Sequence, residues 1–380
     1  MTPKLSLHRL ACFITPHGLG HAARAAGVLA ALQKRQPDIK LTLFTTAAAD
    51  FFTASGCRNV TIHPESLDIG FVQQSALVKD IPETVRRLDA FLPFPDALIR
   101  RLAAEVHKAR CTALICDIAP LGIAVARAAG IPSILIENFT WDNLYEHYAP
   151  HYPRLQVHAD LLRQWFSAAD FHIQTEPVCH RVAAAFATTS PVTRPPKTGP
   201  AAIRRELGVA PGRKMVLITM GGVSERTPLL AHMARRDDLV FVVAWGAPER
   251  RVRGNVICLP LRSAFYHPDL VQAADAVIGK LGYSTLAEVH GSGVPFGYIS
   301  RRNYPEMPGL TAFVERHVAG LELHDADLGA GVEPDFIDRL LALSRRPPAP
   351  VNGADEIAAY MCGDAGVPPK IRPPLQNSSC

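Results

Sequence analysis

The chain has 380 residues, of which 48% are hydrophobic and 20% are charged, a balance typical of packed globular proteins rather than disordered ones. This length suits two domains better than one. The net charge of +5 arises from 40 basic and 35 acidic residues. Such a small excess suits phosphorylated ligands but excludes the strongly basic composition of nucleic-acid-binding proteins.

The eight cysteines and the apolar runs bear on the cellular compartment. No two cysteines form a C-x-x-C pair and several lie in apolar segments, so we predict reduced thiols, no bound metal and a cytoplasmic protein. No apolar run approaches the roughly 20 residues that cross a bilayer. The apolar run near the N-terminus is short and is broken by Pro16 and His17, so we expect no signal peptide.

Strand-like and helix-like patterns alternate along the first half of the chain. Apolar runs predict strands at residues 10–15, 40–45, 59–63, 112–117, 132–137 and 171–175. Helical periodicity predicts helices at residues 22–34, 47–54, 83–109, 121–129 and 155–168. Residues 65–81 and 140–153 are the least regular parts. Strands that alternate with helices indicate a parallel sheet covered on both faces.

The alternation restarts after a proline-rich segment, which we predict to be a linker over residues 191–212. Expected strands follow at residues 214–219, 239–244, 255–259, 276–278 and 295–299, with helices at 268–274, 284–290, 308–317, 334–344 and 354–361. The predicted domains are therefore 1–190 and 213–350, followed by a C-terminal helix and loose tail over 351–380. Two doubly wound α/β domains place a ligand in the cleft between the carboxyl ends of their strands.

The first strand runs into Pro16-His17-Gly18-Leu19-Gly20-His21 and then a helix. Gly18 and Gly20 allow a ligand to approach the backbone at a helix N-terminus, where free N–H groups favour anions. The segment also matches the G-x-G-x-x-A pattern of dinucleotide sites. That class needs an acidic residue at the end of the second strand, and no carboxylate appears there before Asp50.

Three side chains near these strand ends are candidates for proton transfer. His17 and His21 are suited to proton transfer near neutral pH, although each could instead cap the helix, or the pair could bind a metal if a third ligand were present. We predict that one of them is a catalytic base. Asp117 ends a buried strand at the same edge, where it caps the next helix, orients a histidine or accepts a proton.

Further strand ends carry groups that suit a sugar ligand. Asn138, Trp141 and Asp142 follow the strand at 132–137 and can stack on or hydrogen-bond to a sugar, or else form a packed interdomain loop. In the second half, glycines follow two strands and either form tight turns or admit a ligand close to the backbone. These residues are Gly221 and Gly222, with Ser224 close by, and Gly246.

The segment 274–288 is the most informative part of the second half. A strand ends at Lys280 and is followed by Gly282 and the start of a helix at Tyr283, Ser284 and Thr285. Amides at a helix N-terminus can bind a diphosphate, to which the helix dipole adds about 0.3–1 kcal/mol. Glu288 lies one turn further on, within reach of a ribose. The alternative is that the two hydroxyls only cap the helix.

These motifs resemble those of a known family. The segment Asp275–Pro295 is similar to the D-x-x-I-x-K-x-G-Y-x-T-x-x-E-x-x-x-x-G-x-P motif of GT-B glycosyltransferases, typified by the enzyme that adds N-acetylglucosamine to peptidoglycan lipid precursors. The similarity is closer still to the glycosyltransferase-like domain at the front of arabinokinases. It covers Thr15–Arg24, Asp117–Leu121, Gly130–Ser133 and Asn138–Asp142, within a region from about residue 8 to 320. Pro16 and the Leu281 loop depart from the family pattern.

The resemblance implies a GT-B fold, in which two Rossmann-like domains face each other across a cleft. It implies an inverting, metal-independent transfer from a nucleoside-diphosphate sugar, expected to be a UDP-sugar such as UDP-N-acetylglucosamine, without a cofactor. His21 matches the histidine near the reacting centre, with His17 and Asp117 as competing bases. Donor contacts fall to Gly18, Gly20, Gly221, Gly222, Ser224, Gly246, Lys280, Gly282, Tyr283, Ser284, Thr285 and Glu288, and acceptor contacts to Asn138, Trp141 and Asp142.

Two other classes remain open at this point. A nucleotide-sugar 2-epimerase would share the fold and the donor site but would need no acceptor. A non-catalytic module that binds sugar nucleotides would lack turnover. The acceptor is not identified by the sequence, and irregular residues 65–81 and 140–153 are expected to form acceptor loops. We expect no nucleic-acid partner, and contact with a membrane surface only if the acceptor is a lipid.

Overall fold

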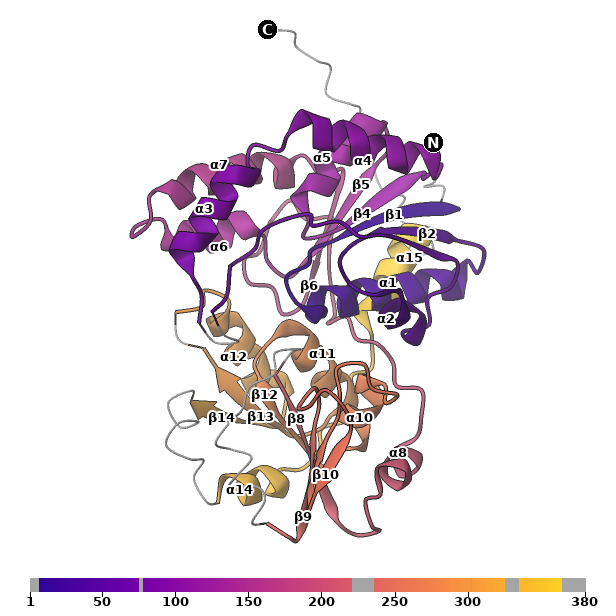
Figure 1. Cartoon of the computed structure of the whole chain (residues 1–380), viewed down its shortest axis with the longest axis vertical. Coiled ribbons are helices and arrows are strands. Elements are labelled where there is room, and N and C mark those ends of the chain that lie inside the picture. Colours follow the sequence, from indigo (N-terminus) through magenta and orange to yellow (C-terminus); the bar gives the residue numbers. More distant parts are fainter. Residues whose placement is uncertain (1–6, 75–77, 221–235, 302, 325–334, 364–380) are drawn as a thin grey trace, which may run out of the picture.

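The protein consists of two α/β domains, one above the other in Figure 1. The computed structural model describes residues 7–74, 78–220, 236–301, 303–324 and 335–363. Each domain contains one seven-stranded sheet with helices on both faces and an apolar cluster on each face. The predicted pair of Rossmann-like domains is therefore confirmed.

The sheet of the first domain has the strand order β3-β2-β1-β4-β5-β6-β7, and all of its pairs are parallel. Strands such as β4 and β5 are buried along their whole length, as expected for a parallel sheet covered on both sides. The elements are β1 (Arg9–Ile14), α1 (Leu19–Arg35), β2 (Lys40–Phe44), α2 (Ala49–Ala54), β3 (Val60–His63), α3 (Ile81–Phe91), α4 (Asp96–Lys108), β4 (Ala113–Asp117), α5 (Pro120–Ala129), β5 (Ser133–Glu137), α6 (Trp141–Tyr148), α7 (Arg154–Ser167), β6 (Phe171–Thr175) and β7 (Ala187–Thr189).

The sheet of the second domain has the order β10-β11-β9-β8-β12-β13-β14 and is parallel except for the edge pair β10–β11. Helix α8 (Pro200–Leu207) lies in the segment expected to be a linker and packs against α10. The remaining elements are β8 (Lys214–Thr219), β9 (Leu239–Val243), β10 (Arg251–Arg253), β11 (Val256–Cys258), α10 (His267–Ala273), β12 (Ala276–Lys280), α11 (Tyr283–Ser292), β13 (Phe296–Ser300), α12 (Met307–His317), β14 (Gly320–His324), α14 (Phe336–Ala342) and α15 (Gly353–Cys362).

The last described helix, α15, returns to the first domain, where Figure 1 shows it in yellow beside α1. Its residues Ile357, Ala358 and Met361 join the apolar cluster formed by α1 and one face of the first sheet. Glu356 accepts a hydrogen bond from the backbone N–H of Ser190 at 2.7 Å. The chain therefore passes between the domains twice, once before and once after the second domain in the sequence.

Two sequence-based expectations about elements are wrong. The single helix expected over 83–109 is two helices, α3 and α4, because Pro93 and Pro95 interrupt the backbone hydrogen bonding between them. The irregular segment 140–153 contains α6, which buries Trp141, Leu144 and Tyr145 against the core. No helix in the described part of the chain is long and apolar enough to cross a membrane.

The strand orders determine where a ligand can bind. In the first sheet, successive strands are added on one side of β1 as far as β3 and then on its other side from β4 onward, so the strand order reverses between β1 and β4. In the second sheet the strand order reverses in the same way between β8 and β12. Open α/β sheets bind ligands at such switch points, beside the carboxyl ends of the strands. The loop that leads from β1 into α1 and the loop that leads from β12 into α11 begin at these two points, and α1 and α11 are in contact.

Candidate active site

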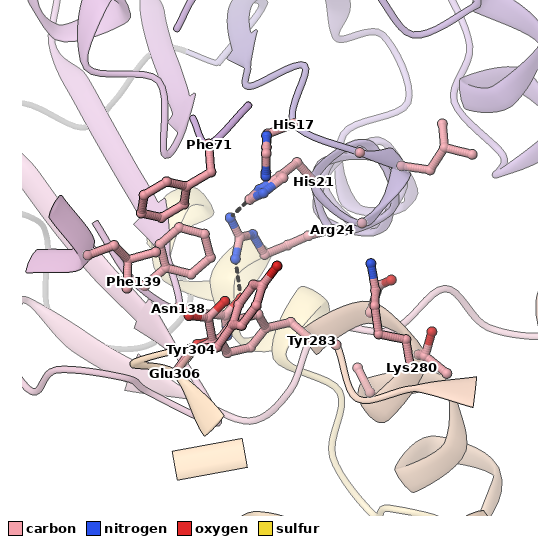
Figure 2. Close-up of a pocket in the computed structure, with 18 of the residues that line it drawn as sticks. His17, His21, Arg24, Phe71, Asn138, Phe139, Lys280, Tyr283, Tyr304 and Glu306 are labelled. Carbon is pink, nitrogen blue, oxygen red and sulfur yellow. Dashed lines mark hydrogen bonds between the residues drawn. The ribbon is translucent and has the colours of Figure 1, made fainter. Parts of the chain in front are cut away.

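A cavity of about 170 Å³ lies between the two domains at these switch points (Figure 2). The predicted residues of both halves meet there. From the first domain it is lined by His17, Gly18, Gly20, His21, Asn138 and Trp141, and from the second by Lys280, Gly282, Tyr283, Ser284 and Thr285. A larger cavity of about 640 Å³ adjoins it, and Leu19 lines both.

A histidine–aspartate pair lies on the first-domain side of the cavity. His21, in the first turn of α1, places Nδ1 3.1 Å from Oδ1 of Asp117, the last residue of β4. Arg24 holds the same carboxylate, since its Nε donates to Oδ2 at 2.8 Å and its Nη2 to Oδ1 at 2.7 Å. Arg24 also donates to Asn138 Oδ1, as Figure 2 shows. The aspartate is therefore fixed from two sides.

The protonation states of this pair follow from its surroundings. Burial lowers the pKa of His21, against the opposing effect of Asp117, so the imidazole is neutral near pH 7. Burial alone would raise the pKa of Asp117, but Arg24 and His21 bring it below its ordinary value. A neutral His21 that donates from Nδ1 to the carboxylate leaves Nε2 able to accept a proton. This is the arrangement expected of a general base.

His17 occupies a different environment in the same turn. Its ring lies edge-on to Trp141, with ring centroids 5.2 Å apart. Burial and neighbouring positive groups lower the pKa of His17 to about 3. Among the residues that the structure describes, no carboxylate forms a hydrogen bond with the ring of His17, so the geometry favours His21 over His17 as the base.

Asp68 is a site residue that the sequence analysis did not single out. It accepts hydrogen bonds from Thr15 Oγ1 at 2.6 Å and from Trp141 Nε1 at 3.0 Å. It thereby fixes the indole that packs against His17. Burial raises the pKa of Asp68 to about 6. It lies in the irregular segment 65–81, where no periodicity indicated which side chains turn inward.

The second-domain side of the cavity is the N-terminus of α11. Its N-cap is Gly282, and no side chain caps the helix; the N-cap of α1 is Gly18, and that helix likewise has no side-chain cap. The alternative that Ser284 and Thr285 only cap α11 is therefore not what the structure shows. The helices approach closely, because a Cβ atom added to Gly20 would lie 3.3 Å from Ser284 Oγ. Two sets of free amide groups thus face one cavity.

Glu288, expected to bind a ribose, is buried and already paired. Arg194 Nη2 donates to its Oε1 at 2.7 Å, and His267 Nδ1 lies 2.7 Å from its Oε2. Burial alone would raise the pKa of Glu288, but the two basic neighbours bring it to about 2. Glu288 itself lines neither cavity. Arg194 and His267 line the larger one, where the His267 ring stacks on Trp245 with centroids 5.3 Å apart.

The other predicted residues lie outside the two cavities or outside the described chain. Asp142 is turned toward α7, with its Oδ2 3.4 Å from Arg163 Nε, and it does not line the cavity. Gly246 follows β9 next to Trp245 but does not line either cavity. Gly221, Gly222 and Ser224 lie outside the described residues. Within the described chain, no group of three or more His, Cys, Asp and Glu side chains is placed to hold a metal ion.

Solved structures with the same arrangement identify the fold. Spinosyn forosaminyltransferase covers 96% of both chains with a TM-score of 0.59 and 17% identity. A calicheamicin glycosyltransferase covers 94% of both with a TM-score of 0.58 and 17% identity. A UDP-glucosyltransferase from Polygonum tinctorium covers 96% of this chain and 93% of its own, with a TM-score of 0.56 and 13% identity. The chain therefore has the GT-B fold, as predicted.

Sequence comparison gives a relative of a different overall size. An L-arabinokinase from Arabidopsis thaliana is 28% identical over 364 residues, which are 94% of this chain and 34% of the plant protein. The chain thus spans about a third of that relative's length. This confirms the resemblance to arabinokinases expected from the motifs. No protein-family model matches the chain.

Proposed function

We propose that the protein is a glycosyltransferase that moves a sugar from a nucleoside-diphosphate sugar, a UDP-sugar, to an acceptor hydroxyl. The observation that carries the proposal is the position of the His21–Asp117 pair across the cavity from the uncapped N-terminus of α11. A general base thereby faces a site suited to a diphosphate. The GT-B fold and its glycosyltransferase neighbours support the same class of reaction.

The proposed reaction is a single displacement at the anomeric carbon. The acceptor oxygen forms a bond to that carbon while the bond to the β-phosphate oxygen breaks, and His21 Nε2 takes the proton of the hydroxyl. The nucleoside diphosphate leaves with the bonding electron pair, and the configuration inverts. Amides of α11 and the Lys280 ammonium stabilise the negative charge of the leaving group, which is the role that a metal ion has in other transferases.

The adjoining cavity suits the nucleoside part of the donor. It shares the lining residue Leu19 with the first cavity and is also lined by the stacked pair Trp245 and His267 and by Arg194. Flat aromatic groups suit a base, and Arg194 and His267 offer donors to ribose oxygens. In this proposal Glu288 acts by orienting these two side chains, with direct contact to the ribose as a further prediction.

The setting of the reaction also belongs to the proposal. The described cysteines are all free thiols, which supports a cytoplasmic location. The acceptor enters from the first-domain side, past Trp141 and Asn138, which line the cavity. A non-catalytic module that binds sugar nucleotides is the second candidate function, because the chain matches only part of the arabinokinase.

Binding and turnover separate these candidates. The protein is titrated with UDP by calorimetry and then incubated with UDP-sugars, while released UDP and the sugar nucleotide are identified by chromatography. A transferase binds UDP and releases UDP from at least one UDP-sugar, as it transfers the sugar to an acceptor or to water. Binding without UDP release supports the module. Conversion of the sugar nucleotide into its epimer, or failure of UDP to bind, contradicts the proposal.

A further inference from the structure

One end of the interdomain cavity holds a lysine enclosed by aromatic rings from both domains. The Nζ atom of Lys79 lies 3.2 Å from the ring centroid of Tyr304, 4.6 Å from that of Phe71 and 4.7 Å from that of Tyr148. It also donates a hydrogen bond to Tyr148 Oη. Lys79, Phe71 and Tyr304 line the cavity. The ammonium is therefore fixed in place and largely removed from water.

An arginine from the second domain lies at the same place. The Cζ atom of Arg301 is 3.8 Å from the ring centroid of Tyr304, so one ring contacts both cations. Glu306 is the carboxylate beside them, with its Oε1 3.5 Å from Arg301 Nη2. Arg301 Nε and Glu306 Oε2 are buried with no hydrogen-bond partner among the described residues. Both side chains line the cavity and are more than nine-tenths buried.

Among the described residues at this end of the cavity, two cations lie beside the carboxylate of Glu306. Arg24 pairs with Asp117, whereas Glu306 acts on both Lys79 and Arg301. After burial and His21, the charges of Lys280, Arg301 and Lys79 also lower the pKa of His17, which lines the same cavity. Burial lowers the pKa of Lys79 to about 7 against the opposing effect of Glu306, because an ammonium loses hydration when it is removed from water.

The position of the cluster relates it to the donor. Residues 301–306 follow β13, which pairs in parallel with β12, and β12 leads into the α11 N-terminus. The carboxyl ends of these adjacent strands meet at one edge of the sheet, so the cluster lies beside the site proposed for the diphosphate. The group next to the diphosphate in a nucleotide sugar is the sugar itself. Figure 2 shows Tyr304 and Glu306 on the same side of the cavity as Tyr283.

We propose that the transferred sugar carries a carboxylate, as a uronic acid does, and that Lys79 and Arg301 bind it. This rests on the proposed function, since it assigns the sugar of the same donor. The carboxylate would accept hydrogen bonds from the Lys79 ammonium and from the guanidinium of Arg301, whose Nε has no hydrogen-bond partner in the part of the chain that the structure describes. The ring of Tyr304 contacts both cations and so keeps them close to each other.

The test compares donors that differ only in this group. Dissociation constants are measured by calorimetry for UDP-glucuronate against UDP-glucose and for UDP-galacturonate against UDP-galactose. One charge-assisted contact is worth about tenfold in affinity, so in at least one pair we expect the acidic donor to bind about tenfold more tightly. Lys79→Met and Arg301→Met are each expected to reduce that ratio about fivefold or more. The affinity of both variants for UDP itself should equal that of the unchanged protein. Lys34→Met, at an exposed lysine, serves as the matched control.

The outcomes separate the two levels of the proposal. Equal affinity for acidic and neutral donors in both pairs overturns the uronosyl assignment, even if UDP binds well. The same holds if the preference survives both substitutions, or if an acidic acceptor proves to be what the cations bind. Failure of UDP itself to bind instead contradicts the proposed function. The comparison of acidic with neutral donors on the unchanged protein tests the uronosyl assignment by itself. A variant that fails to fold therefore does not prevent the test.

Discussion

At the scale of single residues, the site depends on buried charges that hold one another in place. Asp117 is 1% exposed, and its carboxylate forms hydrogen bonds with both Arg24 and His21. Asp117 is therefore ionised while His21 is neutral. Removing one partner of such a buried pair typically costs about 3–5 kcal/mol, because the other charge is left uncompensated. Variants of Asp117 or Arg24 therefore mix catalysis with folding, whereas His21 can be changed without leaving a buried charge.

The buried carboxyl of Asp68 predicts a pH-dependent stability. Its pKa is about 6 in the folded protein, mainly because of burial, against an ordinary value near 4. Between these values the folded state keeps a proton that the unfolded state has released, so this group's contribution to stability falls as the pH rises from about 4 to 6. About two pKa units correspond to roughly 3 kcal/mol. Asp68→Asn removes this component, so the variant should gain stability relative to the unchanged protein as the pH rises.

Urea unfolding at pH 5, 6 and 7 measures this effect. The free energy of unfolding of Asp68→Asn minus that of the unchanged protein should rise with pH and then level off above about pH 7. Its absolute value also includes the loss of one acceptor for Thr15 or Trp141, which does not depend on pH. A difference that stays constant over this range would contradict the account of Asp68.

At the scale of elements, the site is the meeting of two helix N-termini. Helices α1 and α11 each have a glycine as N-cap, and their first turns approach so closely that Gly20 lies against Ser284. This closeness places His21 and the first residues of α11 at the same cavity. A side chain at position 20 would separate them.

Gly20→Val is therefore expected to weaken donor binding. The new Cβ would lie 3.3 Å from Ser284 Oγ, and its methyl groups need more space. We expect UDP to bind about tenfold more weakly, in a calorimetric titration, because the first turns of the two helices must move apart. Gly199→Val is the control, since Gly199 is the N-cap of α8 and a Cβ added there has no atom within 4 Å. Equal effects of the two substitutions would contradict this reading of the interface.

Sequence patterns predicted the elements well where one rule dominated. Buried strands such as β4 and β8 and the glycine turns after β1 and β12 follow from apolar runs and strand ends, and parallel sheets then bring those ends together. The prediction of one helix over 83–109 followed the helical periodicity and neglected Pro93 and Pro95, which separate α3 from α4. Helix α6 was missed because its aromatic residues have modest helix propensity and are held by burial instead.

The site was predictable only where its residues belong to motifs. His21, Asp117 and the α11 turn were found, but Asp68, Lys79 and Arg301 were not. Asp68 and Lys79 lie in an irregular segment, and Arg301 follows a strand whose loop carries no glycine pattern. Their roles depend on contacts between distant segments, such as Lys79 with Tyr304. The pairing of Glu288 with Arg194 was hidden for the same reason.

At the scale of the whole molecule, the two domains form one site that neither contains alone. The first domain supplies His21, the proposed base, and the second supplies the N-terminus of α11 and Arg301, which follows β13. Figure 1 shows α15 returning from the second domain to the first, so two chain segments join the domains. Such an arrangement suits an enzyme that closes on its donor and excludes water during the reaction.

The most direct test of the proposed function replaces His21. UDP release from the best UDP-sugar is followed for the unchanged protein and for His21→Ala, with the exposed His151→Ala as control. Loss of a general base should lower kcat/KM by about 10²–10⁴-fold while UDP still binds with its original affinity, and His151→Ala should change neither. If His21→Ala releases UDP at the original rate, the account of His21 as the base is wrong.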